Sequence, residues 1–360
     1  MQIKSGIEPT PPIGVIDSFG KGFETVVAQI ALISIPLLLD LFLWLGPRLT
    51  VSGLFDSARS MFAPGDDIPD ESLRMIDMTL ESLAESVNLF SFLSTAPLGV
   101  PSMMVSKIGL LSPFGEGLLI PVTSWFGLVV VSVIVSLVGL FLGVTYFTFI
   151  GRETSAEKLQ MDDIELIENV WANWVRMIGF SIAIIASMFV FGFAVSMLAG
   201  LASTVSTGIS GFVISLGVAV WVWGLLFIAF TAHGIIMDSM SINVAVRNSL
   251  LIVRLSMPSV IGLFSLIVLI LWGLGYLWTM PSSESWVLTF GIAAHSFVAT
   301  SLYASTFHFY KDRLRWSIEI QGNAESETHK QTNLGVSRLW GKKDDGEEHD
   351  EKHKQKNGKS

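Results

Sequence analysis

The chain has 360 residues, of which 51% are apolar and 15% are charged, and its mean hydropathy is +0.60. This balance excludes an ordinary soluble globular protein and is typical of an integral membrane protein. The net charge of -9 argues against a nucleic-acid partner, and the absence of cysteine excludes disulfides and cysteine metal sites. Because backbone groups in lipid must pair within the chain, the predicted fold class is all-α.

Six stretches are apolar over the roughly 20 residues that a helix needs to cross a bilayer. They predict a polytopic bundle of six transmembrane helices within residues 1–316. The predicted spans are about 24–46, 118–150, 175–201, 209–233, 259–280 and 286–310. A long outer loop, 47–117, separates the first two spans, and the charged segment 317–360 is expected to be a disordered cytoplasmic tail.

An amphipathic lead-in helix is predicted before the first, third and fifth spans. Apolar residues recur at helical spacing over 16–30 and 164–178, and less regularly over 242–253. With the hairpin that follows each lead-in, the chain is expected to contain three lead-in-plus-hairpin repeats. Such repeats frame a central site in some transporters, but gene duplication without a pore produces them too, and the sequence leaves both interpretations open.

The outer loop 47–117 contains two predicted features. The segment 69–87 has the pattern of a helix, with an early proline, acidic residues in its first turn and a leucine-rich stripe. The apolar segment 89–113 is interrupted by prolines and glycines, which favours a re-entrant or interfacial segment over a seventh span.

Basic residues predict an orientation with both termini in the cytoplasm. With that orientation, the outer turns 202–208 and 281–285 contain no lysine or arginine. Trp44, Trp125 and Trp286 then lie at the outer ends of spans, as an aromatic belt requires. The expected location is the plasma membrane, of the bacterial cytoplasmic type.

Two ionisable residues inside predicted spans are candidates for a transport or relay site. His295 lies near mid-depth in the sixth span, and Asp40 lies in the first. An ionisable residue in a membrane is costly, which makes it a functional candidate by default. The structural alternatives are that His295 hydrogen-bonds a neighbouring helix and that Asp40 faces a polar pocket or the interface, and both are favoured.

Three arginines near the inner ends of spans, Arg176, Arg247 and Arg254, are candidates for contact with lipid headgroups or the membrane interface. The same residues also satisfy the positive-inside pattern. In the tail, the order of acids between His349 and His353 does not match the zinc-protease motif. No catalytic residue, metal ligand or cofactor is predicted.

A family resemblance rests on the three repeat units and on residues between the fourth and fifth spans. Those residues are Asp238, Ala245-x-x-x-Ser249 and Val253-Arg254. The pattern resembles six-span bacterial membrane proteins that are grouped with the membrane domain of glycerophosphodiester phosphodiesterases. In those phosphodiesterases a separate soluble barrel carries the metal and the hydrolysis, and this chain has no room for one. The resemblance therefore implies a shared helix bundle and no phosphodiesterase activity.

The sequence favours a non-catalytic membrane protein, because no acid, base and nucleophile fall at one predicted depth. The predicted function is a scaffold or accessory component that packs with membrane lipids or with a partner, either a second copy or another membrane protein. The alternative is a small secondary transporter or permease, proton-linked through His295 and Asp40. A polar cavity that reaches His295 favours transport, whereas a solidly packed bundle argues against it.

Overall fold

The computed structural model describes most of the chain, with side chains through residue 322. The described residues are 11–54, 75, 78, 87–94, 99–106, 111–115, 117–155 and 163–354. They are predominantly helical, with one short two-stranded sheet, which confirms the all-α class. The chain divides into one compact unit, Ile13–Lys311, and a second unit that contains Asp312–Ser360.

The first predicted span is preceded by a separate helix, as its amphipathic pattern indicates. Helix α1 (Val15–Ala28) ends where Gln29 leaves helical geometry, and the chain turns by 95° into Ile30–Leu45. This second segment consists of the 3-10 turn η1 (Ile30–Ile33) and helix α2 (Ser34–Leu45). The lead-in and the apolar segment are therefore distinct elements.

The remaining helices follow in chain order from the end of the outer loop. They are α5 (Trp125–Thr154), α6 (Asp163–Ser203), α7 (Thr207–Phe227), α8 (Thr231–Asp238), α9 (Ile242–Trp278) and α10 (Leu288–Lys354). The second predicted lead-in continues into its span within α6. The third bends within α9 at Ser256, which has non-helical torsion angles (φ -127°, ψ 25°) two residues before Pro258.

Among the described residues, four helical segments are long and apolar enough to cross a membrane, and the bent pair that includes α1 and α2 makes a fifth if it counts as one span. The four are α5, α6, α7 together with α8, and α9. The apolar part of α10 does not reach the same hydropathy, because its sequence contains His295 and several serines and threonines. The structure is thus that of a helical protein with several segments able to span a bilayer.

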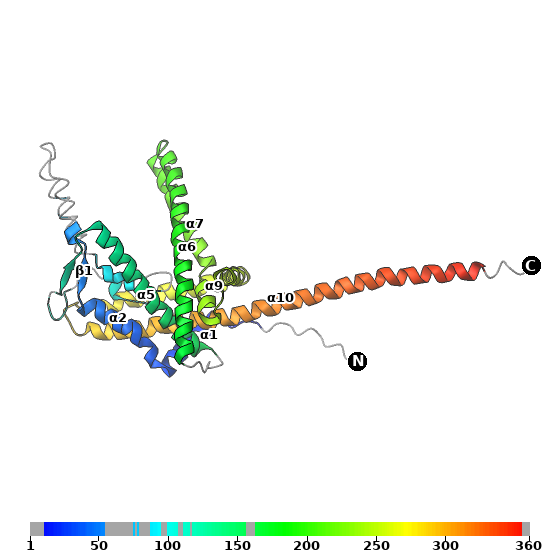
Figure 1. Cartoon of the computed structure of the whole chain (residues 1–360), viewed down its shortest axis with the longest axis horizontal. Coiled ribbons are helices and arrows are strands. Elements are labelled where there is room, and N and C mark those ends of the chain that lie inside the picture. The colour runs from blue at the N-terminus through cyan, green and yellow to red at the C-terminus, as the bar shows by residue number, and fades with distance from the viewer. Residues whose placement is uncertain are drawn as a thin grey trace, which may run out of the picture. The chain divides into compact units, whose positions relative to one another are not determined.

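Helix α10 supplies the centre of the Ile13–Lys311 unit, whereas α6 and α7 lie largely outside its core. The side chains of α10 from Leu288 to Tyr310 include many that are fully buried, both apolar and polar. Helices α6 and α7 lie side by side (Figure 1). Their large apolar side chains are mostly exposed, with Phe189 72% and Phe212 67% accessible. Such a surface is expected to face lipid or a partner.

The outer loop is closed at its base by strands β1 (Arg48–Thr50) and β2 (Leu119–Pro121), which pair in parallel. Within its described residues, segment 89–113 forms the short 3-10 turns η2 (Leu89–Ser94) and η3 (Met104–Ser106). Turn η2 packs on α5 at Gly139, where an added Cβ would lie 2.6 Å from the carbonyl oxygen of Leu93. The predicted helix over 69–87 lies outside the described residues, apart from helical Met75 and Met78 and from Val87 at its end.

The composition of 317–360 predicts disorder, but helix α10 continues through this segment to Lys354. The segment is rich in glutamate and lysine. These residues have high intrinsic helix propensity and form stabilising pairs four positions apart. The same charged composition therefore supports a helical backbone, although it provides few side chains for a packed core.

Candidate functional site: a cavity that reaches His295

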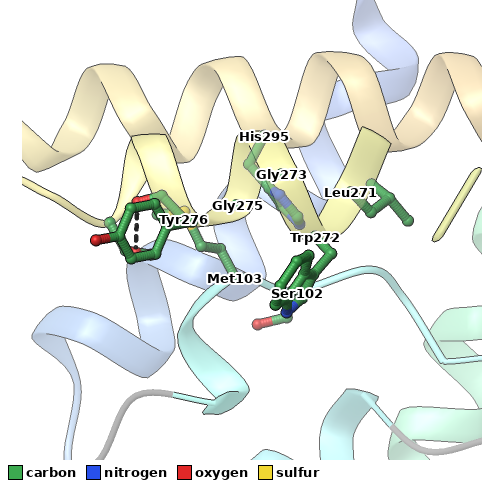
Figure 2. Close-up of a pocket in the computed structure, with 9 residues that line it drawn as sticks. Ser102, Met103, Leu271, Trp272, Gly273, Gly275, Tyr276 and His295 are labelled. Atoms are coloured by element: carbon green, nitrogen blue, oxygen red, sulfur yellow. Dashed lines mark hydrogen bonds between the residues drawn. The ribbon is translucent and has the colours of Figure 1, made fainter. Parts of the chain in front are cut away.

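A cavity of about 680 Å³ lies between helix α9, helix α10 and the outer-loop residues before η3. Seven of its lining residues come from α9 and its end or from α10, and two come from the loop. The lining residues are Ser102, Met103, Leu271, Trp272, Gly273, Gly275, Tyr276, Thr279 and His295. Figure 2 shows these residues around the cavity, with the imidazole of His295 directed toward Trp272 and Ser102.

Helix α9 presents a wall of aromatic rings separated by glycines. Trp272 and Tyr276 are one helical turn apart and are 80% and 73% exposed. At Gly273 and Gly275 an added Cβ would meet no atom within 4 Å. The glycines therefore leave room between the rings, and the wall of the cavity is apolar and wide.

The imidazole of His295 is buried, and its hydrogen bonding within the described protein is incomplete. Its side chain is 8% exposed, and its ring packs edge-to-face on Trp278 with 5.9 Å between centroids. Among the described residues no group hydrogen-bonds its Nδ1 atom, which is itself inaccessible. A buried polar atom without a partner costs about 1–3 kcal/mol. The predicted hydrogen bond from His295 to a neighbouring helix is not found on Nδ1.

Asp40 anchors a loop segment, a role that its position in the sequence does not reveal. Its carboxylate is fully buried and accepts hydrogen bonds from the hydroxyl of Ser102 and from the backbone N–H groups of Met103 and Met104, the latter two at 3.1 Å. Three donors on one carboxylate make strong, charge-assisted contacts. Asp40 thus holds the loop that forms one wall of the cavity against α2.

Ser102 lies between the cavity, which His295 lines, and the carboxylate of Asp40. Ser102 lines the cavity opposite His295 and donates its hydroxyl hydrogen to Asp40. Asp40 does not itself line the cavity. The structure therefore places His295 at the cavity and Asp40 behind its wall, with one hydroxyl between the carboxylate and the cavity.

Three polar side chains of α10 contact polar side chains of neighbouring helices. Tyr146 of α5 donates its hydroxyl to Thr300, His233 of α8 lies 2.8 Å from the hydroxyl of Thr306, and His308 lies 2.9 Å from the hydroxyl of Thr25 in α1. Both histidines therefore contact a side chain of another helix. These contacts give α10 its central place in the bundle.

The three candidate arginines lie away from the cavity. Arg247 and Arg254 are exposed on α9, seven residues apart, on the side opposite the buried Ser249 and Val253. Arg176 is half-buried and donates to the side chain of Asn173 at 2.7 Å. Arg247 and Arg254 are therefore free of the core and suited to a charged surface, whereas Arg176 also orders its own helix.

Ser102, Tyr276 and the glycines Gly273 and Gly275 are cavity residues that the sequence did not single out. A signal was present in the run Trp272-Gly-Leu-Gly-Tyr276, where two glycines separate aromatic residues in an apolar span. Ser102 had no such signal, because its partner Asp40 lies 62 positions away.

Within the described part of the chain, no three histidine, aspartate or glutamate side chains gather into a group that can hold a metal ion. A comparison of the chain with protein-family models, with curated proteins and with solved structures finds no match. The functional conclusion therefore rests on the geometry of the cavity.

Proposed function

We propose that this protein is a multi-pass protein of the bacterial-type plasma membrane that binds a membrane amphiphile in the cavity and acts as an accessory component without catalysis. We further propose that six apolar segments cross the bilayer as three lead-in-plus-hairpin units, with both termini in the cytoplasm. The sixth span is then the apolar part of α10, shielded from lipid by its neighbours. The distribution of basic residues and the exposed apolar surface of α6 and α7 support this arrangement.

The observation that carries the binding function is the cavity itself. It has the volume of a small-molecule site, its aromatic wall on α9 is exposed, and the imidazole of His295 lines it. An amphiphile suits this combination, because its chain packs on Trp272 and Tyr276 while its polar group reaches His295. Ser102, held by Asp40, completes the polar end.

The test is to fill the cavity without disturbing the bundle. At Gly275, which lines the cavity, no atom restricts an added Cβ, so Gly275→Leu projects a side chain into the open space. Gly262→Leu is the matched control, because Gly262 lies on the same helix with open space around it and away from the cavity. Native mass spectrometry of the purified proteins should show a retained amphiphile in wild type and Gly262→Leu. Equal retention in Gly275→Leu contradicts the proposed site.

Proton-linked transport is the second candidate, and the chain of contacts from the cavity through Ser102 to Asp40 favours it. In this case His295 and Asp40 bind or release a proton as a substrate passes. Uptake driven by a proton gradient in reconstituted vesicles is expected to fall in His295→Phe. Unchanged proton-linked uptake in that variant excludes the relay.

A further inference from the structure

We infer that the cavity at His295 selects an uncharged amphiphile whose polar group is a hydroxyl. This inference rests on the proposed binding function and adds the chemical class of the ligand. It depends on two features of the lining: the absence of charge among the described residues that form it, and the direction of the hydrogen bonds around Ser102.

The part of the lining that the structure describes carries no fixed charge. None of the described residues that border the cavity is aspartate, glutamate, lysine or arginine. Asp40 lies behind the wall, but it is fully buried and its oxygens accept hydrogen bonds from Ser102, Met103 and Met104. A phosphate or carboxylate in the cavity would lose its hydration and meet no cation among these lining residues. An ammonium group would likewise meet no anion among them. In both cases the free-energy cost of the lost hydration is large. A neutral head group avoids this cost.

The hydrogen bonds then distinguish a hydroxyl from an ether. Ser102 gives its only hydrogen to Asp40 and receives the N–H of Val105 at 3.3 Å. A serine hydroxyl has one donor and two acceptor lone pairs, so Ser102 has one lone pair left to offer and no hydrogen. A head group that contacts Ser102 must therefore donate a hydrogen bond.

The imidazole of His295 completes the match. A neutral imidazole has one donor and one acceptor nitrogen. Because the Nδ1 atom of His295 is inaccessible, a ligand in the cavity meets the ring at Nε2, which donates or accepts according to the tautomer. A hydroxyl donates and accepts at once, so it can donate to Ser102 and accept from His295, or donate to His295. An ether offers only an acceptor and leaves the lone pair of Ser102 unmatched. The rings of Trp272 and Tyr276 pack the adjoining chain.

The test uses the full-length protein in phosphatidylcholine vesicles and four photoreactive probes. The probes share one diazirine-bearing alkyl chain and end in a primary alcohol, a methyl ether, a carboxylate or a trimethylammonium group. Photolabelled peptides are quantified by mass spectrometry for the cavity segments 99–106 and 271–279. The exposed surface of α6 and α7 supplies the non-selective reference in the same sample.

The alcohol is expected to label the cavity about five- to tenfold more than the ether, which corresponds to one hydrogen bond, and more than either charged probe. His295→Phe and Ser102→Ala should each reduce alcohol labelling to the ether level. Ether labelling that persists in these variants shows that the cavity remains folded. Ser187→Ala, on the exposed part of α6, is the control and should match wild type.

Equal labelling by all four probes overturns the head-group assignment and leaves amphiphile binding intact. Preferential labelling by the trimethylammonium probe also overturns it, in favour of a cation held by the aromatic rings. Labelling of the cavity that never exceeds the α6–α7 reference, for any probe, contradicts the binding function itself and the head-group assignment with it.

Discussion

Buried polar side chains on α10 differ in whether they contact a polar side chain of a neighbouring helix. Thr300 and Thr306 are bonded to Tyr146 and His233, and they join three elements of the bundle. His295 has the same burial and the same residue class as His233, yet it points into a cavity. Burial alone therefore does not separate a histidine that joins two helices from one that lines a cavity, whereas the contacts of the imidazole do.

Replacing Thr306 by valine keeps the shape of the side chain and removes the hydroxyl that lies 2.8 Å from His233. Because the imidazole is then left buried without that partner, we expect the free energy of unfolding to fall by about 0.5–2 kcal/mol. Unfolding in detergent with increasing denaturant measures the change. Thr204→Val is the control, since Thr204 is exposed and bonds only to its own turn. Equal stability of the two variants argues against the interhelical bond.

Asp40→Asn tests the carboxylate that holds the cavity wall. An amide has one acceptor oxygen in place of two and no charge, so it cannot accept from Ser102, Met103 and Met104 as the carboxylate does. Amide hydrogen exchange at Met103 and Met104 is expected to accelerate about tenfold or more. Glu284→Gln, which removes a charge from an exposed turn, should leave those amides unchanged. Slow exchange in Asp40→Asn contradicts the anchoring role.

At the scale of elements, close approach of backbones determines which helices contact α10. An added Cβ at Gly22 of α1 would overlap the hydroxyl of Ser305 and the carbonyl oxygen of Ser301. Gly291 of α10 approaches the carbonyl oxygen of Trp278 in the same way, at 2.7 Å. Glycine at these positions allows α1 and the end of α9 to pack directly on α10.

Gly22→Ala and Gly20→Ala form a matched pair on α1. The first substitution places a methyl group where backbone and side-chain atoms of α10 already lie. Because of this steric overlap, we expect a loss of about 1–3 kcal/mol in the free energy of unfolding. The second meets no atom within 4 Å and should be neutral or stabilising by up to about 1 kcal/mol, because alanine favours the helix. Denaturant unfolding of both proteins provides the comparison, and equal effects contradict the close packing of α1 on α10.

At the scale of the whole molecule, the proposed orientation can be tested without a background signal, because the chain contains no cysteine. Glu284→Cys places a thiol in the exposed turn between α9 and α10, and Ser155→Cys places one directly after α5. A membrane-impermeant maleimide should label Glu284→Cys in intact cells and Ser155→Cys only after permeabilisation. The reverse pattern overturns the orientation with both termini in the cytoplasm.

The sequence by itself determined the helical class and the positions of the long apolar helices. The predicted span 209–233 lies largely within α7 and continues into α8, and 259–280 lies mostly in α9 after its kink. Hydrophobic length and helical periodicity are local properties, so they can be read from consecutive residues. The kink itself agrees with Pro258, whereas nothing local separates the continuous α6 from the sharply bent α1–α2 pair.

Only the tertiary structure decided which polar residues are anchors and which face a cavity. Asp40 meets Ser102 across 62 positions, and His308 meets Thr25 across 283. Such partners depend on how helices pack, and one sequence contains no record of those contacts. Asp40 and His295 were recognised as unusual because ionisable groups in apolar spans are costly. Their separate places, one behind the wall and one in the cavity, follow from the packing of α2, α9 and α10 around the outer loop.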